Sequence, residues 1–249
     1  MQRLKDQVAI ITGAASGIGR ATALRFTAEG AKLFCMDMQE QALADTAKMI
    51  SDAGGEAKTC ICDVSDEAQV SAAIKACVDA FGKIDHVINM AGILRFGETH
   101  EFEAGHFDQI MKVNVAGTFL MCKAALPHLI ESNGSIVNAA STAAHSGLPW
   151  GACYSASKGA ILSMTRSIAV EYAEMGVRAN TVSPGDIVTE GMANPELPKG
   201  VNMKLMQRAM SLTGRKGPEV IASAIALLCS EDGVHITGED IRIDGGTLS

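Results

Sequence analysis

The chain has 249 residues, a size at which a single α/β domain is common, and 47% of them are hydrophobic. Together with only six prolines, this content predicts a substantial buried core and argues against extended disorder. The formal net charge is −7 and basic residues are spread singly, which excludes the basic patch that nucleic acid or an anionic membrane requires. We therefore expect a small-molecule partner.

The amino terminus lacks an apolar signal core, and we expect no stretch that approaches the ~20 apolar residues of a membrane span. Seven cysteines show no paired metal-ligand spacing, so we interpret them as reduced structural thiols. Cys153 adjoins Tyr154, but the sequence identifies no histidine partner for a nucleophile there. These features predict a cytoplasmic protein without a metal site.

Apolar runs bounded by turn signals alternate along the chain with amphipathic helical segments. Strands are predicted at 8–12, 32–36, 56–64, 86–89, 135–140, 177–183 and 240–244. Helices are predicted at 17–29, 39–53, 66–81, 107–130, 152–174 and 218–229. Most strands are rich in Val and Ile without polar alternation, so helices should cover both faces of a parallel sheet. We expect one Rossmann-type domain over 1–249, doubly wound around about seven parallel strands.

One segment, 186–213, is less regular and contains GMANPELPKG followed by a Met-rich stretch. Open α/β sheets bind ligands at the carboxyl ends of their strands. We expect this segment to be a variable, substrate-covering insertion over that edge.

The first predicted strand runs directly into a helix through VAIITGAASGIGRATALRF, with glycines at 13, 17 and 19. Glycine permits a tight turn and a close approach of the backbone to a pyrophosphate, while the helix directs its unpaired N–H groups at the anion. The spacing is G-x-x-x-G-x-G rather than the commoner G-x-G-x-x-G. It predicts a nucleotide-binding turn.

The second strand, KLFCMD, ends on Asp37, which lies 18 residues after Gly19. A carboxylate at this place can accept hydrogen bonds from both hydroxyls of an adenosine ribose and would repel a 2′-phosphate. The neighbouring Ala15 and Met38 supply no cation. Asp37 therefore favours NAD over NADP.

Tyr154 and Lys158 are four residues apart within YSASK, so one helical face carries both side chains. A nearby ammonium stabilises a phenolate and lowers the pKa of the tyrosine. Ser141 ends the strand GSIVNAAS thirteen residues before Tyr154, where its hydroxyl can polarise a substrate oxygen. A Y-x-x-x-K spacing alone is more often ordinary helix surface, and the surrounding residues give it weight.

With these residues in view, the chain resembles the short-chain dehydrogenase/reductase family over essentially its whole length. The matching segments are TGAASGIG at 12–19, CDV at 62–64, NMAG at 89–92, the Asn114 of KVNVAGTF, Ser141, YSASK at 154–158, SPGDIVT at 183–189 and IDGG at 243–246. Two positions depart from the family pattern. Met90 stands where the family usually has Asn, and Ala140 stands where a second serine is common.

The resemblance implies that hydride passes between C4 of a nicotinamide and the substrate carbon while Tyr154 exchanges a proton with the substrate oxygen. Ser141 would hold that oxygen. Lys158 would bind the nicotinamide ribose and lower the pKa of the tyrosine, and Asn114 would hold a water that links Lys158 to solvent. Asp63 would meet the adenine, with Val64 beside the ring.

The implied cofactor-binding residues follow from the same motifs. They are Gly13, Ser16, Gly17, Ile18, Gly19, Asp37, Met38, Asp63, Val64, Asn89, Ala91, Gly92, Tyr154, Lys158, Pro184, Gly185, Ile187 and Thr189. The family also implies a homotetramer, which could pair the apolar segments 107–130 and 152–174 across subunits.

Position along the chain suggests a largely apolar substrate surface. Its candidates are Ile93, Leu94, Ala143, His145, Leu148, Trp150, Met192, Met203, Met206 and Met210. Flexible methionines suit irregular hydrophobic ligands, which predicts a bulky secondary alcohol or ketone, alicyclic or steroid-like. Packing in a core or subunit interface explains the methionines about as well, and loop packing explains His145 and Trp150 equally.

The function that these observations favour is NAD(H)-dependent oxidation of a secondary alcohol or reduction of the ketone. An NADPH-dependent 3-oxoacyl carrier-protein reductase is the nearest alternative, and Asp37 and the negative net charge argue against it. A catalytically inert nucleotide-binding scaffold is a second alternative. It is disfavoured because all four residue types of the relay are present.

Overall fold

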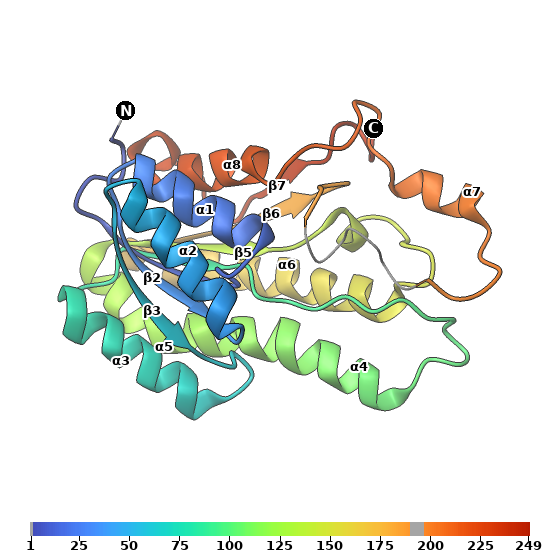
Figure 1. Cartoon of the computed structure of the whole chain (residues 1–249), viewed down its shortest axis with the longest axis horizontal. Helices are drawn as coiled ribbons and strands as arrows, with labels where there is room; N and C mark the ends of the chain where they lie inside the picture. The colour runs from blue at the N-terminus through green and yellow to red at the C-terminus, as the bar shows by residue number, and fades with distance from the viewer. Residues whose placement is uncertain (1, 190–196) are drawn as a thin grey trace.

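Seven parallel strands form a single sheet in the computed structural model of the chain, which describes residues 2–189 and 197–249 (Figure 1). The strands are β1 Val8–Thr12, β2 Lys32–Asp37, β3 Glu56–Ile61, β4 His86–Asn89, β5 Ser135–Ala139, β6 Arg178–Pro184 and β7 Asp240–Ile243. Their spatial order is β3-β2-β1-β4-β5-β6-β7. The order reverses between β1 and β4, and ligands bind at such a switch point in open α/β sheets.

The central strand β1 shows why the sheet needs helices on both faces. All five of its residues are buried, and alternate side chains enter different hydrophobic cores. Val8 and Ile10 belong to one core, whereas Ala9 and Ile11 belong to the other. Because successive side chains of a strand point to opposite faces, an uninterrupted apolar run has both faces covered.

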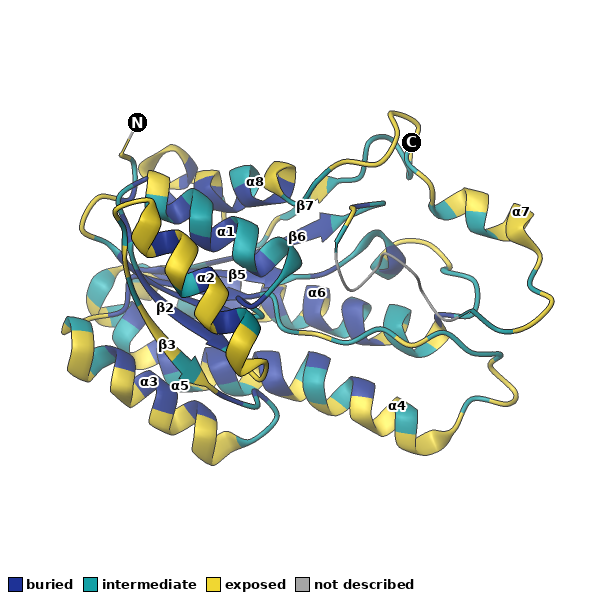
Figure 2. Ribbon diagram, viewed as in Figure 1, coloured by how far each residue is buried: buried dark blue, intermediate teal, exposed yellow. Residues whose placement is uncertain are grey.

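The helices supply that cover in two layers. Helices α1 Gly17–Ala28, α2 Glu40–Asp52 and α8 Glu219–Cys229 contribute to one core, and α3 Glu67–Phe81, α5 Gly117–Ser132 and α6 Ala152–Tyr172 contribute to the other. Figure 2 shows the central strands buried between helices whose outer faces are exposed, whereas the edge strand β3 is largely exposed. The predicted doubly wound, Rossmann-type α/β fold is confirmed.

The predicted helix 107–130 differs from the structure in extent and in form. It consists of α4 Ala104–Ile110, a π-helical turn at Met111–Ala116 and α5, which together run without interruption. Within this helix, Ala104–Ser132, an 18-residue window has a mean hydropathy of 1.3, so by length and composition alone the helix could cross a membrane. From the sequence we expected no such stretch; this helix meets the criterion by length and composition only, and 44% of the window is buried inside the fold. The apolar face has a different use here, because α5 packs against α3, β4 and β5.

The other element boundaries shift by a few residues. Strand β3 ends at Ile61, so Asp63 lies in the loop that follows it, and β2 extends to Asp37. The described part of the irregular segment contains a short helix, α7 Met203–Met206, and a 3₁₀ turn, Gln207–Ala209. Figure 1 shows α7 and the first turn of α4 beyond the same edge of the sheet.

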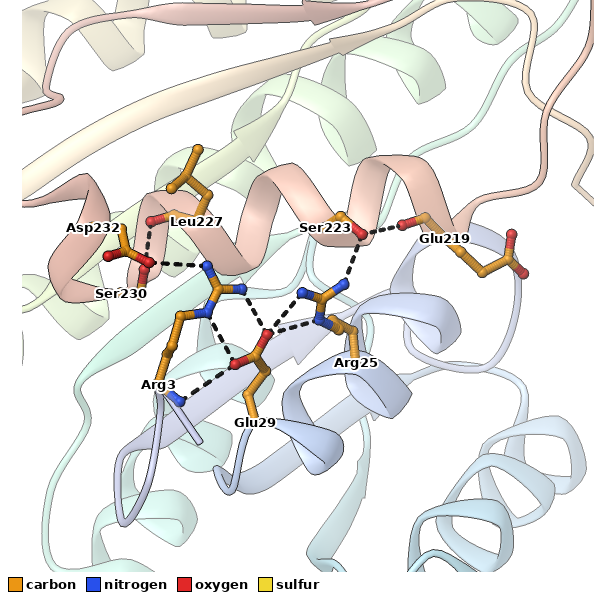
Figure 3. A network of polar contacts seen from close by, with 8 residues as sticks. All are labelled: Arg3, Arg25, Glu29, Glu219, Ser223, Leu227, Ser230 and Asp232. Carbon is orange, nitrogen blue, oxygen red and sulfur yellow. Dashed lines mark hydrogen bonds and ion pairs between the residues drawn. The ribbon is translucent and has the colours of Figure 1, made fainter. Parts of the chain in front are cut away.

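The opposite, amino edge of the sheet is tied together by a network of ion pairs (Figure 3). The buried carboxylate of Glu29, at the end of α1, receives Arg3 Nη2 at 2.6 Å and Arg25 Nε at 2.8 Å. Arg25 also donates to Ser223 of α8 at 2.8 Å. These bonds join the amino-terminal segment, α1 and α8 at the end of the molecule away from α7.

Candidate active site

A cavity of about 1180 Å³ lies at the carboxyl ends of the central strands. The loops after β1, β2, β4, β5 and β6 all contribute to its walls, together with α6 and the described part of the covering segment. The site is therefore assembled from segments that are far apart in sequence, as expected for a switch point of a parallel sheet.

The glycine turn after β1 forms one wall and has no room for larger residues. Gly13 has a φ of +67°, and a Cβ added to it would lie 2.9 Å from the backbone nitrogen of Ala91. A Cβ on Gly19 would overlap the carbonyl oxygen of Gly13. Helix α1 begins immediately afterwards, and the side chain of its N-cap residue, Ser16, makes no capping hydrogen bond. Its first N–H groups are therefore left for a ligand.

Asp37 lies at the end of β2, on the cavity wall. One of its carboxylate oxygens accepts a hydrogen bond from Ala15 N at 3.0 Å, and the other accepts one from Gln39 N at 3.0 Å. Each carboxylate oxygen has a further lone pair. The carboxylate is thus fixed by the glycine turn and can still accept hydrogen bonds from two hydroxyls.

The segment after β4 is held against the glycine turn by Thr12, a residue that the sequence predictions did not single out. Its hydroxyl oxygen accepts hydrogen bonds from both Met90 N and Ala91 N at 3.1 Å. Thr12 is the first residue of the TGAASGIG motif, and this place in the motif was the only feature of the sequence that could have indicated its role. The bonds place Ala91 and Gly92 on the cavity wall.

Ser141 and Tyr154 meet on the wall formed by β5 and α6. Ser141 caps the 3₁₀ turn Thr142–Ala144, and its hydroxyl oxygen accepts a hydrogen bond from Ala143 N at 3.2 Å. A hydrogen bond also joins Ser141 to the phenol of Tyr154. Two groups that can hold or transfer a proton therefore adjoin each other, as the sequence predicted.

Lys158 lies one helical turn after Tyr154, and its Nζ is 5.6 Å from the centre of the tyrosine ring. It is buried and donates a hydrogen bond to the carbonyl oxygen of Ala139 at 2.6 Å. Burial lowers the pKa of Lys158 to about 8, because the protonated ammonium loses hydration.

The pKa of Tyr154 changes in the direction opposite to the sequence prediction. Burial raises the pKa of the phenol, and the hydrogen bond with Ser141 is what lowers it. Lys158 is not among the causes that act on this pKa in the chain by itself, so the lowering of the tyrosine pKa by Lys158 stays a prediction. Sequence spacing predicted the proximity of the two groups but not the desolvation that acts on both.

Asn114 is fully buried within the π-helical turn, and both sides of its amide are bonded. Its Oδ1 accepts from Ile93 N at 2.8 Å, while its Nδ2 donates to Ile93 O and to Ser157 Oγ, each at 3.0 Å. A Cβ on Gly92 would lie 3.2 Å from Asn114 Oδ1 and 3.6 Å from Lys158 Nζ. Asn114 Oδ1 and Lys158 Nζ therefore border the same small space.

Ser157 is a second residue that the sequence predictions missed. It is fully buried and its hydroxyl donates to the carbonyl oxygen of Tyr154 at 2.7 Å while it accepts from Asn114. It lies between Tyr154 and Lys158 within YSASK, which was the only signal in the sequence. Ser157 connects the π-helical turn to α6.

Most of the remaining predicted residues also line the cavity. Those of the predicted cofactor end are Ser16, Gly17, Ile18, Met38, Asp63, Val64, Pro184, Gly185, Ile187 and Thr189. Those of the predicted substrate surface are Ile93, Leu94, Ala143, Leu148, Met203, Met206 and Met210. Arg95, His106 and Arg215 line it as well and were not predicted.

Four of the described predicted residues do not line the cavity. Asn114 is buried within the π-helical turn, and the other three lie elsewhere. Asn89 turns into the core, where its Nδ2 donates to Asn138 Oδ1 at 2.8 Å. The ring of His145 is bonded to Asp240 at 2.7 Å, outside the cavity wall. Trp150 has a φ of +59° and borders a separate hollow of about 410 Å³. Met192 lies outside the described residues.

The cavity fits a nicotinamide dinucleotide. The close approach of Gly13 and Gly19 to their neighbours leaves an open backbone cradle at the start of α1, which suits a pyrophosphate. Asp37 offers acceptors on one side of this cradle, whereas Tyr154 and Lys158 lie on the wall formed by α6. A molecule with a ribose at each side of a pyrophosphate matches this distribution of groups.

Comparison with known proteins supports the same assignment. Residues 13–247 match the family model described as Enoyl-(Acyl carrier protein) reductase. The 2-(S)-hydroxypropyl-CoM dehydrogenase 3 of Xanthobacter autotrophicus is 40% identical over 98% of this chain and 97% of its own. The levodione reductase of Leifsonia aquatica is 37% identical over 98% and 95%, and a 2,5-dichloro-2,5-cyclohexadiene-1,4-diol dehydrogenase of Sphingobium indicum is 38% identical over 98% and 97%.

Solved structures agree with the observed topology. Carveol dehydrogenase of Mycobacterium avium, in complex with NAD, has a TM-score of 0.91 and 25% identity and covers 100% of this chain and 99% of its own. A short-chain dehydrogenase of Burkholderia cenocepacia, in complex with NADP, has a TM-score of 0.90 and 29% identity, with 99% and 100% covered. The chain therefore belongs to the short-chain dehydrogenase/reductase family and is an oxidoreductase of that family acting on alcohols.

Proposed function

We propose that this protein is an NAD(H)-dependent dehydrogenase that interconverts a secondary alcohol and its ketone. The observation that carries the proposal is the convergence of Ser141, Tyr154 and Lys158 on one cavity wall, across from a glycine cradle flanked by Asp37. Bound NAD(H) would supply hydride exchange at C4 of its nicotinamide ring.

Tyr154 would exchange the proton with the substrate oxygen as general acid or base. Ser141 Oγ accepts the N–H of Ala143 and adjoins the Tyr154 phenol, so its O–H would turn to donate to a substrate oxygen held beside the two. Lys158 would hold the nicotinamide ribose and stabilise the phenolate. Asn114 has one lone pair of Oδ1 left for a water that links Lys158 to solvent.

The test of this assignment is the variant Tyr154→Phe. Removal of a general acid or base lowers kcat by about 100- to 10,000-fold, so we expect a loss in that range with NADH binding retained. The chain has only one other tyrosine, Tyr172, at the end of the same helix, and Tyr172→Phe is the matched control. Undiminished turnover by Tyr154→Phe would refute the mechanism, and no turnover by the native chain would favour an inert scaffold.

We propose NAD rather than NADP because the carboxylate of Asp37, which is held by Ala15 N and Gln39 N at the end of β2, would repel a 2′-phosphate. Similar structures contain NAD in one case and NADP in another, so they do not favour either cofactor, and the proposal depends on the residues of this chain. Initial rates with NADH and NADPH at equal concentration decide the choice. A preference for NADPH would overturn the assignment.

For the substrate, we propose a bulky and largely apolar secondary alcohol, alicyclic or steroid-like. Leu94, Leu148, Met203, Met206 and Met210 supply apolar lining, and methionines adapt to irregular ligands. A relative whose name specifies a cyclohexadiene diol supports the alicyclic class. A panel of cyclic alcohols, hydroxysteroids and 3-hydroxyacyl thioesters, followed at the NADH absorbance band, would rank the candidates.

A 3-oxoacyl carrier-protein reductase that uses NADPH is the second candidate, because the matching family model carries an acyl-carrier-protein reductase description. Such an enzyme must bind an acidic carrier protein, and the net charge of −7 disfavours that contact. Turnover of the 3-hydroxyacyl thioester together with a preference for NADPH would favour this candidate.

We further propose a cytoplasmic homotetramer. The described cysteines are all free thiols, which suits a reducing compartment. Phe119 on α5 and Val170 on α6 expose 50% and 81% of their surface, and association across these helices would bury them. Sedimentation equilibrium that gives a monomer mass would contradict this assembly.

A further inference from the structure

We propose that His145 is a positioning residue that fixes Ser141 by anchoring its loop to Asp240. The inference rests on the proposed role of Ser141, and it concerns a side chain that lies outside the cavity. His145 Nε2 is 2.7 Å from Asp240 Oδ2, which joins the segment after β5 to the edge strand β7.

Asp240 is a rigid anchor because its carboxylate is buried and both of its oxygens accept hydrogen bonds. Only 5% of its side chain is exposed, compared with 26% of the side chain of His145. Its other oxygen, Oδ1, accepts hydrogen bonds from Thr181 Oγ1 at 2.5 Å and from Ser183 Oγ at 2.8 Å. Both donors lie on β6, so three hydrogen bonds hold this carboxylate between two strands and the loop.

The bond to Asp240 also fixes the tautomer of His145. A carboxylate accepts and does not donate, so Nε2 must carry the proton and act as the donor. This requirement holds for a neutral imidazole and for a protonated one. The contact therefore needs an N–H at the reach of Nε2 and does not need a charge on the ring.

A single turn of 3₁₀ helix transmits the position of His145 to Ser141. His145 N donates to Thr142 O at 3.0 Å, and Ala144 N donates to Ser141 O at 2.9 Å. Ser141 caps this turn through its own hydroxyl oxygen, at the end opposite to His145. A displacement of His145 would thus be carried along the turn to the serine hydroxyl.

A backbone hydrogen bond also supports Ser141, but only on the side of the preceding strand. Ala140 N donates to Val182 O at 2.9 Å, which fixes the strand before the serine but not the turn after it. Among the described residues, two contacts of His145 Nε2 tie the far end of this turn to the sheet: the bond to Asp240 Oδ2 at 2.7 Å and a longer contact with Ser183 Oγ on β6 at 3.4 Å. Its loss should let the serine move while the cofactor site stays intact.

Two variants of similar polarity separate the reach of the side chain from its chemistry. The amide nitrogen of His145→Gln extends to the place of Nε2, whereas the amide of His145→Asn reaches only the place of Nδ1. We expect His145→Asn to lower kcat about tenfold with an unchanged Kd for NADH, and His145→Gln to recover most of kcat. A similar kcat for the two variants would overturn the inference.

A double-mutant cycle with Ser141→Ala tests whether His145 acts through the serine. In the Ser141→Ala background, His145→Asn should lower kcat by no more than about twofold, because the group that it positions is gone. An equal loss in both backgrounds would mean that His145 acts independently of Ser141 and would overturn the proposal. Loss of activity in Tyr154→Phe, measured alongside, keeps this outcome distinct from a failure of the proposed function.

General destabilisation is controlled at the other edge of the sheet. Glu29→Gln disrupts the network of Figure 3, which lies away from the cavity, and should lower the melting temperature with no change in kcat. If Glu29→Gln lowered kcat as much as His145→Asn at an equal loss of melting temperature, the effect of His145 would be nonspecific and the proposal would fail.

Discussion

At the scale of single residues, Tyr154 and Lys158 illustrate how a buried site acts on protonation. Burial disfavours the charged form of each group, so the pKa of the phenol rises and the pKa of the ammonium falls to about 8. Lys158 offsets part of this cost through its bond to the carbonyl oxygen of Ala139. Burial of these two ionisable groups lowers the stability of the fold at the place where a proton would be transferred, as is common at functional sites.

The pH dependence of stability should reveal Lys158. Its pKa is about 8 in the folded chain and about 10.5 when unfolded, so between these values the unfolded state holds a proton that the native state lacks. Stability contributed by this group therefore rises with pH through that window, by about 3 kcal/mol in total. Lys158→Met removes the rise, and urea unfolding at pH 7.5 and pH 9.5 measures the part that falls between these values, about 2 kcal/mol.

The difference between the pH dependence of stability of the native chain and that of Lys158→Met isolates the contribution of Lys158. Buried thiols such as Cys35 and Cys122, whose pKa values burial raises to about 12, act in the opposite direction at high pH and are present in both proteins. They cancel in the difference. Equal pH dependence in the two proteins would mean that the pKa of Lys158 is not lowered.

Asp37 allows a second prediction about a single residue. Asp37→Asn keeps an acceptor for Ala15 N and removes the charge that would repel a 2′-phosphate. The ratio of kcat/KM for NADH to that for NADPH should fall about tenfold, which corresponds to about 1.4 kcal/mol of differential binding. Asp45→Asn, on the exposed face of α2, is the control and should leave the ratio unchanged.

At the scale of elements, the turn between β1 and α1 depends on close backbone packing, whereas the turn between α4 and α5 depends on an altered helical period. In the first, Gly13 and Gly19 allow the strand, the helix and the segment after β4 to meet. In the second, the π-helical turn at Met111–Ala116 contains Asn114 and aims its amide at Ile93 and Ser157. Wide helical turns of this kind are frequent at functional sites.

Gly19→Ala tests the glycine turn. The added methyl would overlap the carbonyl oxygen of Gly13, so the turn must open, and we expect the Kd for NADH to rise about ten- to a hundredfold. Gly105→Ala is the matched control in α4, where a Cβ meets no neighbouring atom, and it should be neutral or slightly stabilising. Fluorescence titration with NADH measures both. An unchanged Kd for Gly19→Ala would mean that the turn does not hold the pyrophosphate.

At the scale of the whole molecule, the two ends of the parallel strands have different roles. The carboxyl edge holds the cavity, and the amino edge holds stabilising polar contacts. His86, at the start of β4, is buried between Gln7 Oε1 at 2.7 Å and Ser135 Oγ at 2.9 Å, and burial lowers its pKa to about 4. A substitution at this edge should change stability without changing catalysis.

We expect His86 to make the folded chain less stable in mild acid. Below about pH 6.5 the unfolded chain takes up a proton that the folded chain resists until about pH 4, so stability falls as pH falls through this window. The loss between pH 6.5 and pH 4.5 should be about 2 to 3 kcal/mol, and His86→Gln should reduce it. Urea unfolding at both pH values provides the measurement. An identical loss in the variant would assign the acid sensitivity to other groups.

The sequence predicted the features that local chemistry specifies. Continuous Val and Ile runs identified the buried strands, and the glycine spacing and YSASK located Gly13, Tyr154 and Lys158 on the cavity wall. The π-helical turn was missed because one wider turn hardly alters the apolar periodicity around it.

Side-chain directions in loops were the least predictable feature. His145 and Trp150 follow Ser141 closely in sequence, yet each turns away from the cavity. The reason lies in long-range partners, since Asp240 receives His145 and the carbonyl oxygen of Trp150 accepts Gly97 N at 2.9 Å. Ser157 was missed for a similar reason, because only the folded chain brings Asn114 against it.

Trp150 also makes the chain its own optical reporter. It is the only tryptophan, it precedes Tyr154 by four residues, and the hollow beside it is also bordered by Leu205 of the covering segment. All indole emission therefore originates at the rim of the site, and that emission overlaps the absorption of reduced nicotinamide. Quenching of this emission by energy transfer would let NADH arrival be timed in a stopped-flow experiment on the unlabelled protein.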